Sequence, residues 1–155
     1  MTTTIGASVL DSSLFISDLK PKRKLAALQE MVQRAHDHGV VREPRLLLDT
    51  LMLRERLGGS AIGKAVAIPH ARSVAVREAR LVVACSRRGI DWGAPDDLDV
   101  QLVLLVLSPS DSPCSAHCER VIRTASFARL QRNRQRLLDA VDPAAAAAAI
   151  GDLVS

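Results

Sequence analysis

The stretch Arg54 to His70, RERLGGSAIGKAVAIPH, decides the fold, because within it a helix ends and a short strand begins. The run Ala65 to Ile68 is apolar and partly β-branched, which is typical of a strand. Pro69 has no N–H for a strand ladder, and it disfavours helical backbone at Ile68. The pattern therefore predicts a strand that stops at Pro69 and presents His70 at its end.

His70 on its own leaves two interpretations open. It is either a reactive imidazole that another molecule can approach, or a buried imidazole that bonds to a backbone carbonyl. The small residues Ala67 and Ala71 flank it and would allow a close approach. A lone histidine is a weak motif, so spacing does not separate the two.

A longer pattern does separate them: Arg-Glu-x-Leu-Gly-x-x-x-Ile-Gly-x-x-x-Ala-Ile-Pro-His, which begins at Arg54 and ends at His70. It closely resembles the active-site signature of type 2 phosphotransferase-system IIA domains, the mannitol, fructose and nitrogen-regulatory group. The resemblance covers about Ile5 to Leu153. It implies one type 2 IIA domain over residues 1–155, with a mannitol-type α/β fold in which helices flank a mixed β-sheet.

The resemblance also implies the site. His70 matches the family's phosphorylated histidine, His117 matches the second histidine that supports the phosphoryl group, and Arg54 matches the active-site arginine. Ser60 is a candidate for hydroxyl help. The chain departs from the family at Cys118, where a leucine is common, which bears on local packing. No cofactor is implied.

The chemistry of these residue types agrees with such a site. A neutral imidazole nitrogen can attack a phosphoryl group and hold it, and the transfer needs positioning and charge stabilisation more than acid–base work. A cation such as Arg54 can stabilise the equatorial oxygens. Taken singly, Arg54 could instead be a charge favoured by a helix C-terminus, and His117 could simply cap or pack.

The rest of the chain is predicted to form helices that flank one sheet. The spacing of Leu25, Leu28, Val32 and Ala35 predicts one apolar face of a helix over Lys22 to His36, which Gly39 ends. Further segments are predicted from caps, prolines and apolar runs. They are a helix from Pro44 to Leu57, strands at Ala79–Ser86 and Val100–Leu107, a helix capped by Ser112 with Pro113 in its first turn, and a terminal helix of Ala144–Ala149 capped by Asp142.

Composition limits the classes of function. With 155 residues and 48% hydrophobic content the chain can bury one core, and no apolar run is long enough to span a membrane. Three cysteines without a disulfide pattern favour a reducing compartment, so we expect a cytoplasmic protein. The net charge of +4 includes a basic run from Arg129 to Arg136, read as the solvated face of a helix. Nucleic-acid binding is not expected, because aromatic stacking residues are nearly absent.

Cys114, His117 and Cys118 have a spacing that would place them on one helix face, as metal ligands require. They supply only three ligands, and His36 and His38 point away from each other on their own helix. No metal site is therefore predicted.

The resemblance implies a phosphoryl carrier that accepts phosphate on His70 from a histidine-containing phosphocarrier protein. A stand-alone IIA segment resembles the nitrogen-regulatory members, whose phosphorylation controls binding to a regulatory target protein. The alternatives are a sugar-specific IIA component that passes phosphate to a IIB protein, and a non-catalytic interaction module. Motifs for nucleotide or hydrolase chemistry are not found.

Overall fold

The computed structural model describes residues 14–151. In this part of the chain six strands form one sheet with the order β1-β5-β6-β3-β2, and β4 also pairs with β6. The strands are β1 (Phe15–Ile16), β2 (Ala61–Gly63), β3 (Val66–Ala67), β4 (His70–Ser73), β5 (Arg80–Ile90) and β6 (Val100–Pro109). The helices are α2 (Lys24–Asp37), α3 (Pro44–Leu57), α4 (Cys114–Arg129), α5 (Gln131–Asp139) and α6 (Pro143–Ala149).

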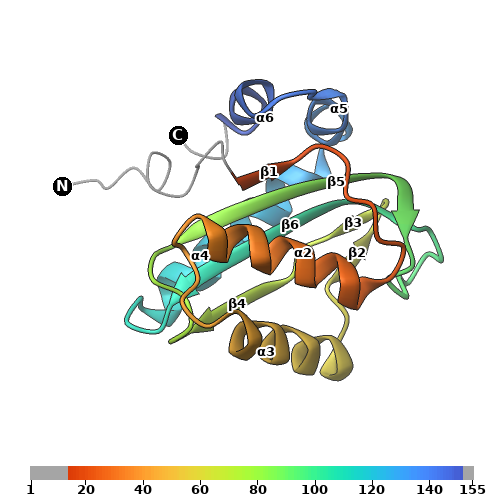
Figure 1. The fold of residues 1–155 in the computed structure, drawn as a ribbon. Coiled ribbons are helices and arrows are strands. Elements are labelled where there is room, and N and C mark those ends of the chain that lie inside the picture. Colours follow the sequence, from red (N-terminus) through yellow and green to blue (C-terminus); the bar gives the residue numbers. More distant parts are fainter. Residues whose placement is uncertain (1–13, 152–155) are drawn as a thin grey trace.

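The sheet is mixed, since β5 and β6 are antiparallel while β1 runs parallel to β5, and β3 and β4 run parallel to β6. Helices α2 and α3 cover one face, and α4 lies on the other, with α5 and α6 beside β1 and β5 (Figure 1). The predicted α/β fold with a mixed sheet flanked by helices is confirmed. In the described residues, no helix is long and apolar enough to cross a membrane.

Strand β6 is the centre of the core, and both of its faces are buried as its continuous Val/Leu run predicts. Val103, Leu105 and Leu107 pack toward α2 and α3. Leu104 and Val106 pack on the opposite side, in the cluster that contains residues of α4, α5 and α6. The side chains of β6 and of its parallel neighbours therefore divide between two separate apolar layers.

The expected strand before His70 is partly wrong. It begins at Val66 rather than Ala65, because Lys64 and Ala65 form a two-residue turn with φ of 58° and 63°. The pairing of this segment with a neighbouring strand also does not end at Pro69. The chain resumes as β4 at His70 in the same register along β6, since Val106 donates its N–H to the Pro69 carbonyl at 3.0 Å. Pro69 thus interrupts the ladder, because it has no N–H, without moving the strand.

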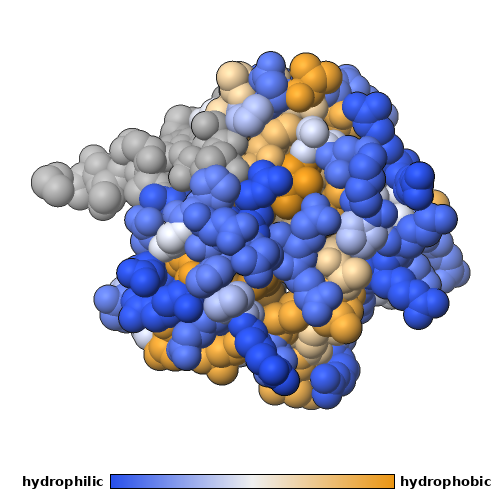
Figure 2. All heavy atoms as spheres, viewed as in Figure 1, coloured by the Kyte–Doolittle hydropathy of each residue, from blue (hydrophilic) through white to orange (hydrophobic). Residues whose placement is uncertain are grey.

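The predicted apolar face of the first helix is also partly wrong. Leu25 is 46% exposed, while Leu28, Val32 and Ala35 are buried with Ala27 and Met31. The buried stripe therefore contains three of the four predicted residues and is widened by Ala27 and Met31, each one position before a predicted residue. In Figure 2, which views the side carrying α2 and α3, hydrophobic patches lie among mostly hydrophilic residues.

Of the two predicted helix caps, one is confirmed and the other is wrong. Asp142 caps α6 by accepting the N–H of Ala145 at 2.8 Å, as predicted. Ser112 does not cap α4: Pro113 is the N-cap residue without a side-chain bond, and the Ser112 hydroxyl accepts from Arg120 instead.

The basic run is split between two helices, because α4 ends at Arg129 and α5 starts at Gln131. Arg132 and Arg136 are exposed, as expected for a solvated face. Arg134 is half-buried and donates to the carbonyls of Ala128 and Arg129, which closes the end of α4.

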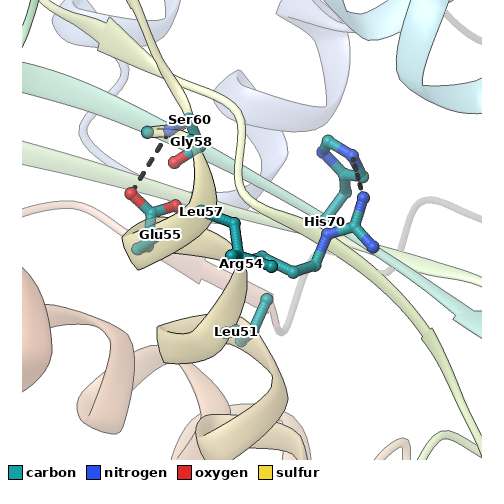
Figure 3. Close-up of a pocket in the computed structure, with 8 residues that line it drawn as sticks. Leu51, Arg54, Glu55, Leu57, Gly58, Ser60 and His70 are labelled. Carbon is teal, nitrogen blue, oxygen red and sulfur yellow. Dashed lines mark hydrogen bonds between the residues drawn. The ribbon is translucent and has the colours of Figure 1, made fainter.

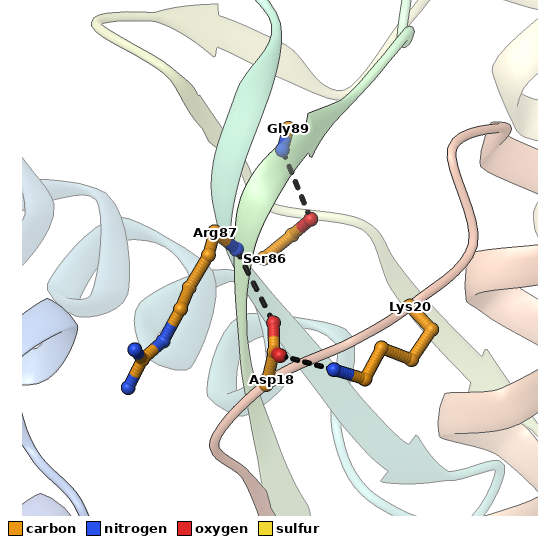
Figure 4. A network of polar contacts seen from close by, with 5 residues as sticks. All are labelled: Asp18, Lys20, Ser86, Arg87 and Gly89. Atoms are coloured by element: carbon orange, nitrogen blue, oxygen red, sulfur yellow. Dashed lines mark hydrogen bonds and ion pairs between the residues drawn. The ribbon is translucent and has the colours of Figure 1, made fainter.

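A small polar network fastens the segment after β1 to β5 (Figure 4). Asp18 accepts the backbone N–H of Arg87 at 3.5 Å and pairs with Lys20, whose hydrogen bond holds the pKa of the Asp18 carboxyl below its usual value. Ser86 accepts the N–H of Gly89 at 3.2 Å where the β5 register shifts. Gly89 has a φ of +84°, and a side chain there would meet Asp99.

Candidate functional site

His70 lies at the start of β4, opposite Val106 of β6, and its side chain is on the same side of the sheet as α4. Its Nδ1 lies 3.0 Å from the Ile68 carbonyl oxygen. A carbonyl only accepts, so in the neutral imidazole Nδ1 carries the proton. The lone pair is therefore on Nε2, away from the strand.

Arg54 approaches this nitrogen from the end of α3. Its Nη2 lies 3.3 Å from Nε2 of His70, and Figure 3 shows the side chain extending from the last turn of the helix toward the imidazole. Leu51, Leu57, Gly58 and Ser60 line the same open pocket, whose volume is about 350 Å³. The structure thus brings together two of the three residues predicted for the site.

The third residue, His117, is in the first turn of α4 and is 8% exposed. Its ring centroid lies 5.6 Å from that of His70, with 47° between the ring planes. Burial is the largest cause that lowers the pKa of His117 to about 4, and the charges of His70, Arg120, Arg54 and Arg72 contribute in that order. His117 is therefore a neutral imidazole near pH 7, able to offer one N–H.

The sequence pattern did not identify two arginines that lie near the site. Arg72 of β4 donates from Nε to the Ser112 carbonyl at 2.7 Å, and Arg120 of α4 donates to the hydroxyls of Ser108 and Ser112. The available signal was spacing: Arg72 is two residues after His70 on a strand, and Arg120 is three residues after the second histidine on a helix.

Ser60, the hydroxyl candidate, lines the pocket and belongs to a partly buried hydrogen-bond network. Its hydroxyl accepts from Nε1 of Trp92 at 3.1 Å, and Glu55 Oε1 accepts from the same nitrogen at 3.0 Å and from the Ser60 N–H at 3.2 Å. Lys24 pairs with Glu55 at 3.1 Å. This network ties the end of α3 to the loop before β2, so it fixes one wall of the pocket.

The cysteine cluster on α4 does not converge with His117. Cys114 and Cys118 are exposed while His117 is buried. Within residues 14–151, no group of three or more His, Cys, Asp or Glu side chains could hold a metal ion. Cys85, read as a small core residue, is buried in β5, and burial raises the pKa of its thiol to about 11.

Comparison with known proteins supplies the family. The model for the family described as "Phosphoenolpyruvate-dependent sugar phosphotransferase system, EIIA 2" matches residues 8–152. The chain therefore belongs to the type 2 EIIA family of the phosphotransferase system.

Relatives within this family carry both regulatory and sugar-specific names. A nitrogen regulatory protein from Bradyrhizobium diazoefficiens is 34% identical over 116 residues, which are 75% of this chain and 72% of that protein. A fructose-specific EIIA component from Haloferax volcanii is 30% identical over 110 residues, which are 71% of each. The crystal structure of the nitrogen regulatory protein IIA-Ntr from Neisseria meningitidis superposes with a TM-score of 0.83 at 24% identity, covering 96% of this chain and 99% of that one. This last likeness shows a shared fold.

Proposed function

We propose that this chain is a phosphoryl carrier of the phosphoenolpyruvate-dependent phosphotransferase system, which accepts a phosphoryl group on Nε2 of His70 from a histidine-containing phosphocarrier protein. The observation that carries the proposal is the ring environment of His70. The Ile68 carbonyl holds the proton on Nδ1, which leaves a lone pair on Nε2 beside the guanidinium of Arg54.

In the proposed step the Nε2 lone pair of His70 forms a new N–P bond while the N–P bond of the donor's phosphohistidine breaks. The donor nitrogen keeps the electron pair of the broken bond, so no oxidant or added proton is needed. The proton stays on Nδ1 of His70, hydrogen-bonded to the Ile68 carbonyl oxygen, throughout. Such a transfer depends on alignment and charge stabilisation, which a prepared site supplies.

Arg54 and His117 take complementary roles in this proposal. Arg54 places a cation 3.3 Å from the attacking nitrogen, where it stabilises the equatorial phosphoryl oxygens. His117 donates an N–H to the same group, which its position beside His70 and its low pKa support. A neutral donor leaves the new N–P bond intact, whereas an acidic one would favour its hydrolysis.

The phosphate then serves a regulatory, nitrogen-type role, in which phosphorylation of His70 controls binding to a target protein. The 34% identity to a nitrogen regulatory protein favours this role. The second candidate is a sugar-specific IIA component that passes the phosphate to a IIB protein, and the 30% identity to a fructose-specific component favours that one. Both use the same first step.

We also propose that residues 1–155 form one IIA domain that works in the cytoplasm. The family match over residues 8–152 supports the first part. Three cysteines that are all free in the structure, two of them exposed, support a reducing compartment.

The test is the intact mass after incubation with phosphoenolpyruvate, the general phosphotransferase enzyme and its histidine carrier. We expect one acid-labile phosphoryl group on the wild type and none on His70→Ala. His38→Ala is the matched control: His38 bonds to the Arg34 carbonyl at the end of α2, so this variant should be phosphorylated normally. A folded wild type that accepts no phosphate would overturn the proposal in favour of an interaction module. Mixing the phosphorylated protein with a IIB protein then separates the two downstream roles.

A further inference from the structure

A fully buried hydroxyl at the end of β6 connects two residues of α4. Ser108 is 0% exposed, and its Oγ lies 2.7 Å from Nδ1 of His117. The same oxygen lies 3.3 Å from Nε and 3.0 Å from Nη2 of Arg120. Residues three apart on a helix share a face, so His117 and Arg120 both reach this one oxygen.

The hydrogen-bonding capacity of the three groups determines where the protons lie. A serine hydroxyl has one proton and two lone pairs, whereas a guanidinium can only donate. The two bonds from Arg120 therefore use both lone pairs of Ser108 Oγ. The hydroxyl proton is left for Nδ1 of His117, which must accept it and must carry its own ring proton on Nε2.

We propose that Arg120 is a positioning residue, which acts through Ser108 to hold His117 in the tautomer that keeps Nε2–H available as a donor toward the phosphoryl group on His70. The proposal rests on the proposed function, because it assumes that His117 donates a hydrogen bond to a phosphoryl group that is transferred to His70. Nε2 of His117 makes no hydrogen bond to another residue within 14–151, and the two rings are 5.6 Å apart.

Arg120 is held firmly enough for this role. Its Nη2 also donates to the Ser112 hydroxyl at 2.7 Å, and the Ser112 carbonyl accepts from Arg72 at 2.7 Å. The half-buried guanidinium is thus fixed by two hydroxyls rather than by a carboxylate. Without it, Ser108 Oγ would regain free lone pairs and could accept a hydrogen bond from Nδ1–H, so the other tautomer of His117 would become available.

The first measurement is the tautomer of His117, read from the ¹⁵N shifts of its side chain near pH 7 in the unphosphorylated protein. We expect Nε2–H in the wild type and a gain of Nδ1–H in Arg120→Ala. Arg129→Ala removes an exposed charge from the same helix and should leave the tautomer unchanged. Wild-type His117 in the Nδ1–H form, or a tautomer that Arg120→Ala does not alter, would overturn the proposal.

The second measurement is the rate of phosphoryl transfer to His70 in Arg120→Ala, in Ser108→Ala and in the double variant, each confirmed to be folded by Trp92 fluorescence. We expect each single variant to be about tenfold slower, the worth of one hydrogen bond to a charged group, and the double variant to be no slower than either. Losses that multiply would mean that Arg120 contacts the phosphoryl group directly, and an unchanged rate would mean that the tautomer does not matter; each would overturn the proposal.

Failure of the proposed function is distinguishable from failure of this inference. If wild-type protein accepts no phosphate, the transfer rates have no meaning. The tautomer measurement then decides by itself whether Arg120 controls His117: a shift in Arg120→Ala supports that control, and the absence of a shift overturns it.

Discussion

The carboxylate of Glu55 should contribute more to stability than any other acidic side chain on α3. Its side chain is 4% exposed. Oε1 accepts from Trp92 Nε1 at 3.0 Å and from the Ser60 N–H at 3.2 Å, and it pairs with Lys24 Nζ at 3.1 Å. The change Glu55→Ala removes the acceptor of all three groups at once.

The cost can be worked out group by group. A buried donor left without a partner costs about 1–3 kcal/mol. Trp92 is 2% exposed and retains a bond to Ser60 Oγ, so its share is at the low end of that range. The Ser60 N–H adds a second such term. Lys24 is 22% exposed at its side chain and recovers part of its hydration. We therefore expect Glu55→Ala to lower the free energy of unfolding by about 3 kcal/mol, within the range for breaking a buried ion pair.

Urea denaturation measures this directly, because Trp92 is the only tryptophan in the chain and its fluorescence reports the same region. Glu55→Gln keeps one acceptor oxygen and should lose about 1–2 kcal/mol. The matched control is Glu43→Ala, an exposed residue at the start of α3 whose side chain makes no cap bond, with an expected loss below about 0.5 kcal/mol. A loss for Glu55→Ala no larger than that of Glu43→Ala would refute the reasoning.

Three further changes have defined outcomes. Ala65→Gly should raise the free energy of unfolding by about 1 kcal/mol in urea, because Ala65 has a φ of 63° in a turn that favours glycine. Stability should fall as the pH drops from about 6.5 through 4, by at most about 3 kcal/mol, because the pKa of His117 is lowered to about 4 in the folded protein and the unfolded chain takes up the proton first. That part of the fall should be missing in His117→Gln, as urea midpoints at pH 7 and pH 5 would show. Brief alkylation of the native protein at pH 8 should add two labels by mass, at Cys114 and Cys118, and a third, at Cys85, only after unfolding, since that thiol is buried with a pKa of about 11.

The parts of the fold that could be predicted depend on local chemistry. The long apolar runs of β5 and β6, the interruption at Pro69 and the Asp142 cap each follow from residues close together in the sequence. The family pattern ending at His70 was long enough to indicate the fold, and the resemblance that it carries implied three site residues, of which His117 lies outside the pattern.

The predictions that failed were those where tertiary contacts compete with local preference. Ser112 has the residue type of a helix cap, but its hydroxyl accepts from Arg120, an interaction that exists only when α4 packs on β6. The helix spacing from Leu25 fits an apolar face, yet the sheet that it faces decides which residues are buried. Nor could spacing show that β3 and β4 share one register, because the partner strand β6 comes thirty residues and more after them.

The two histidines likewise come close only through tertiary contacts, and so do the arginines of the site. Arg54, Arg72 and Arg120 come from α3, β4 and α4, and none of them forms an ion pair with a carboxylate within residues 14–151. Burial of His117 and the charges of these arginines keep that imidazole neutral, and Arg54 lies 3.3 Å from Nε2 of His70. A doubly charged phosphoryl group on His70 would offset part of the repulsion among these three cations, without requiring contact with Arg120. The fold therefore carries an unfavourable electrostatic arrangement that an anion on His70 would relieve, which is the property that a phosphoryl acceptor needs.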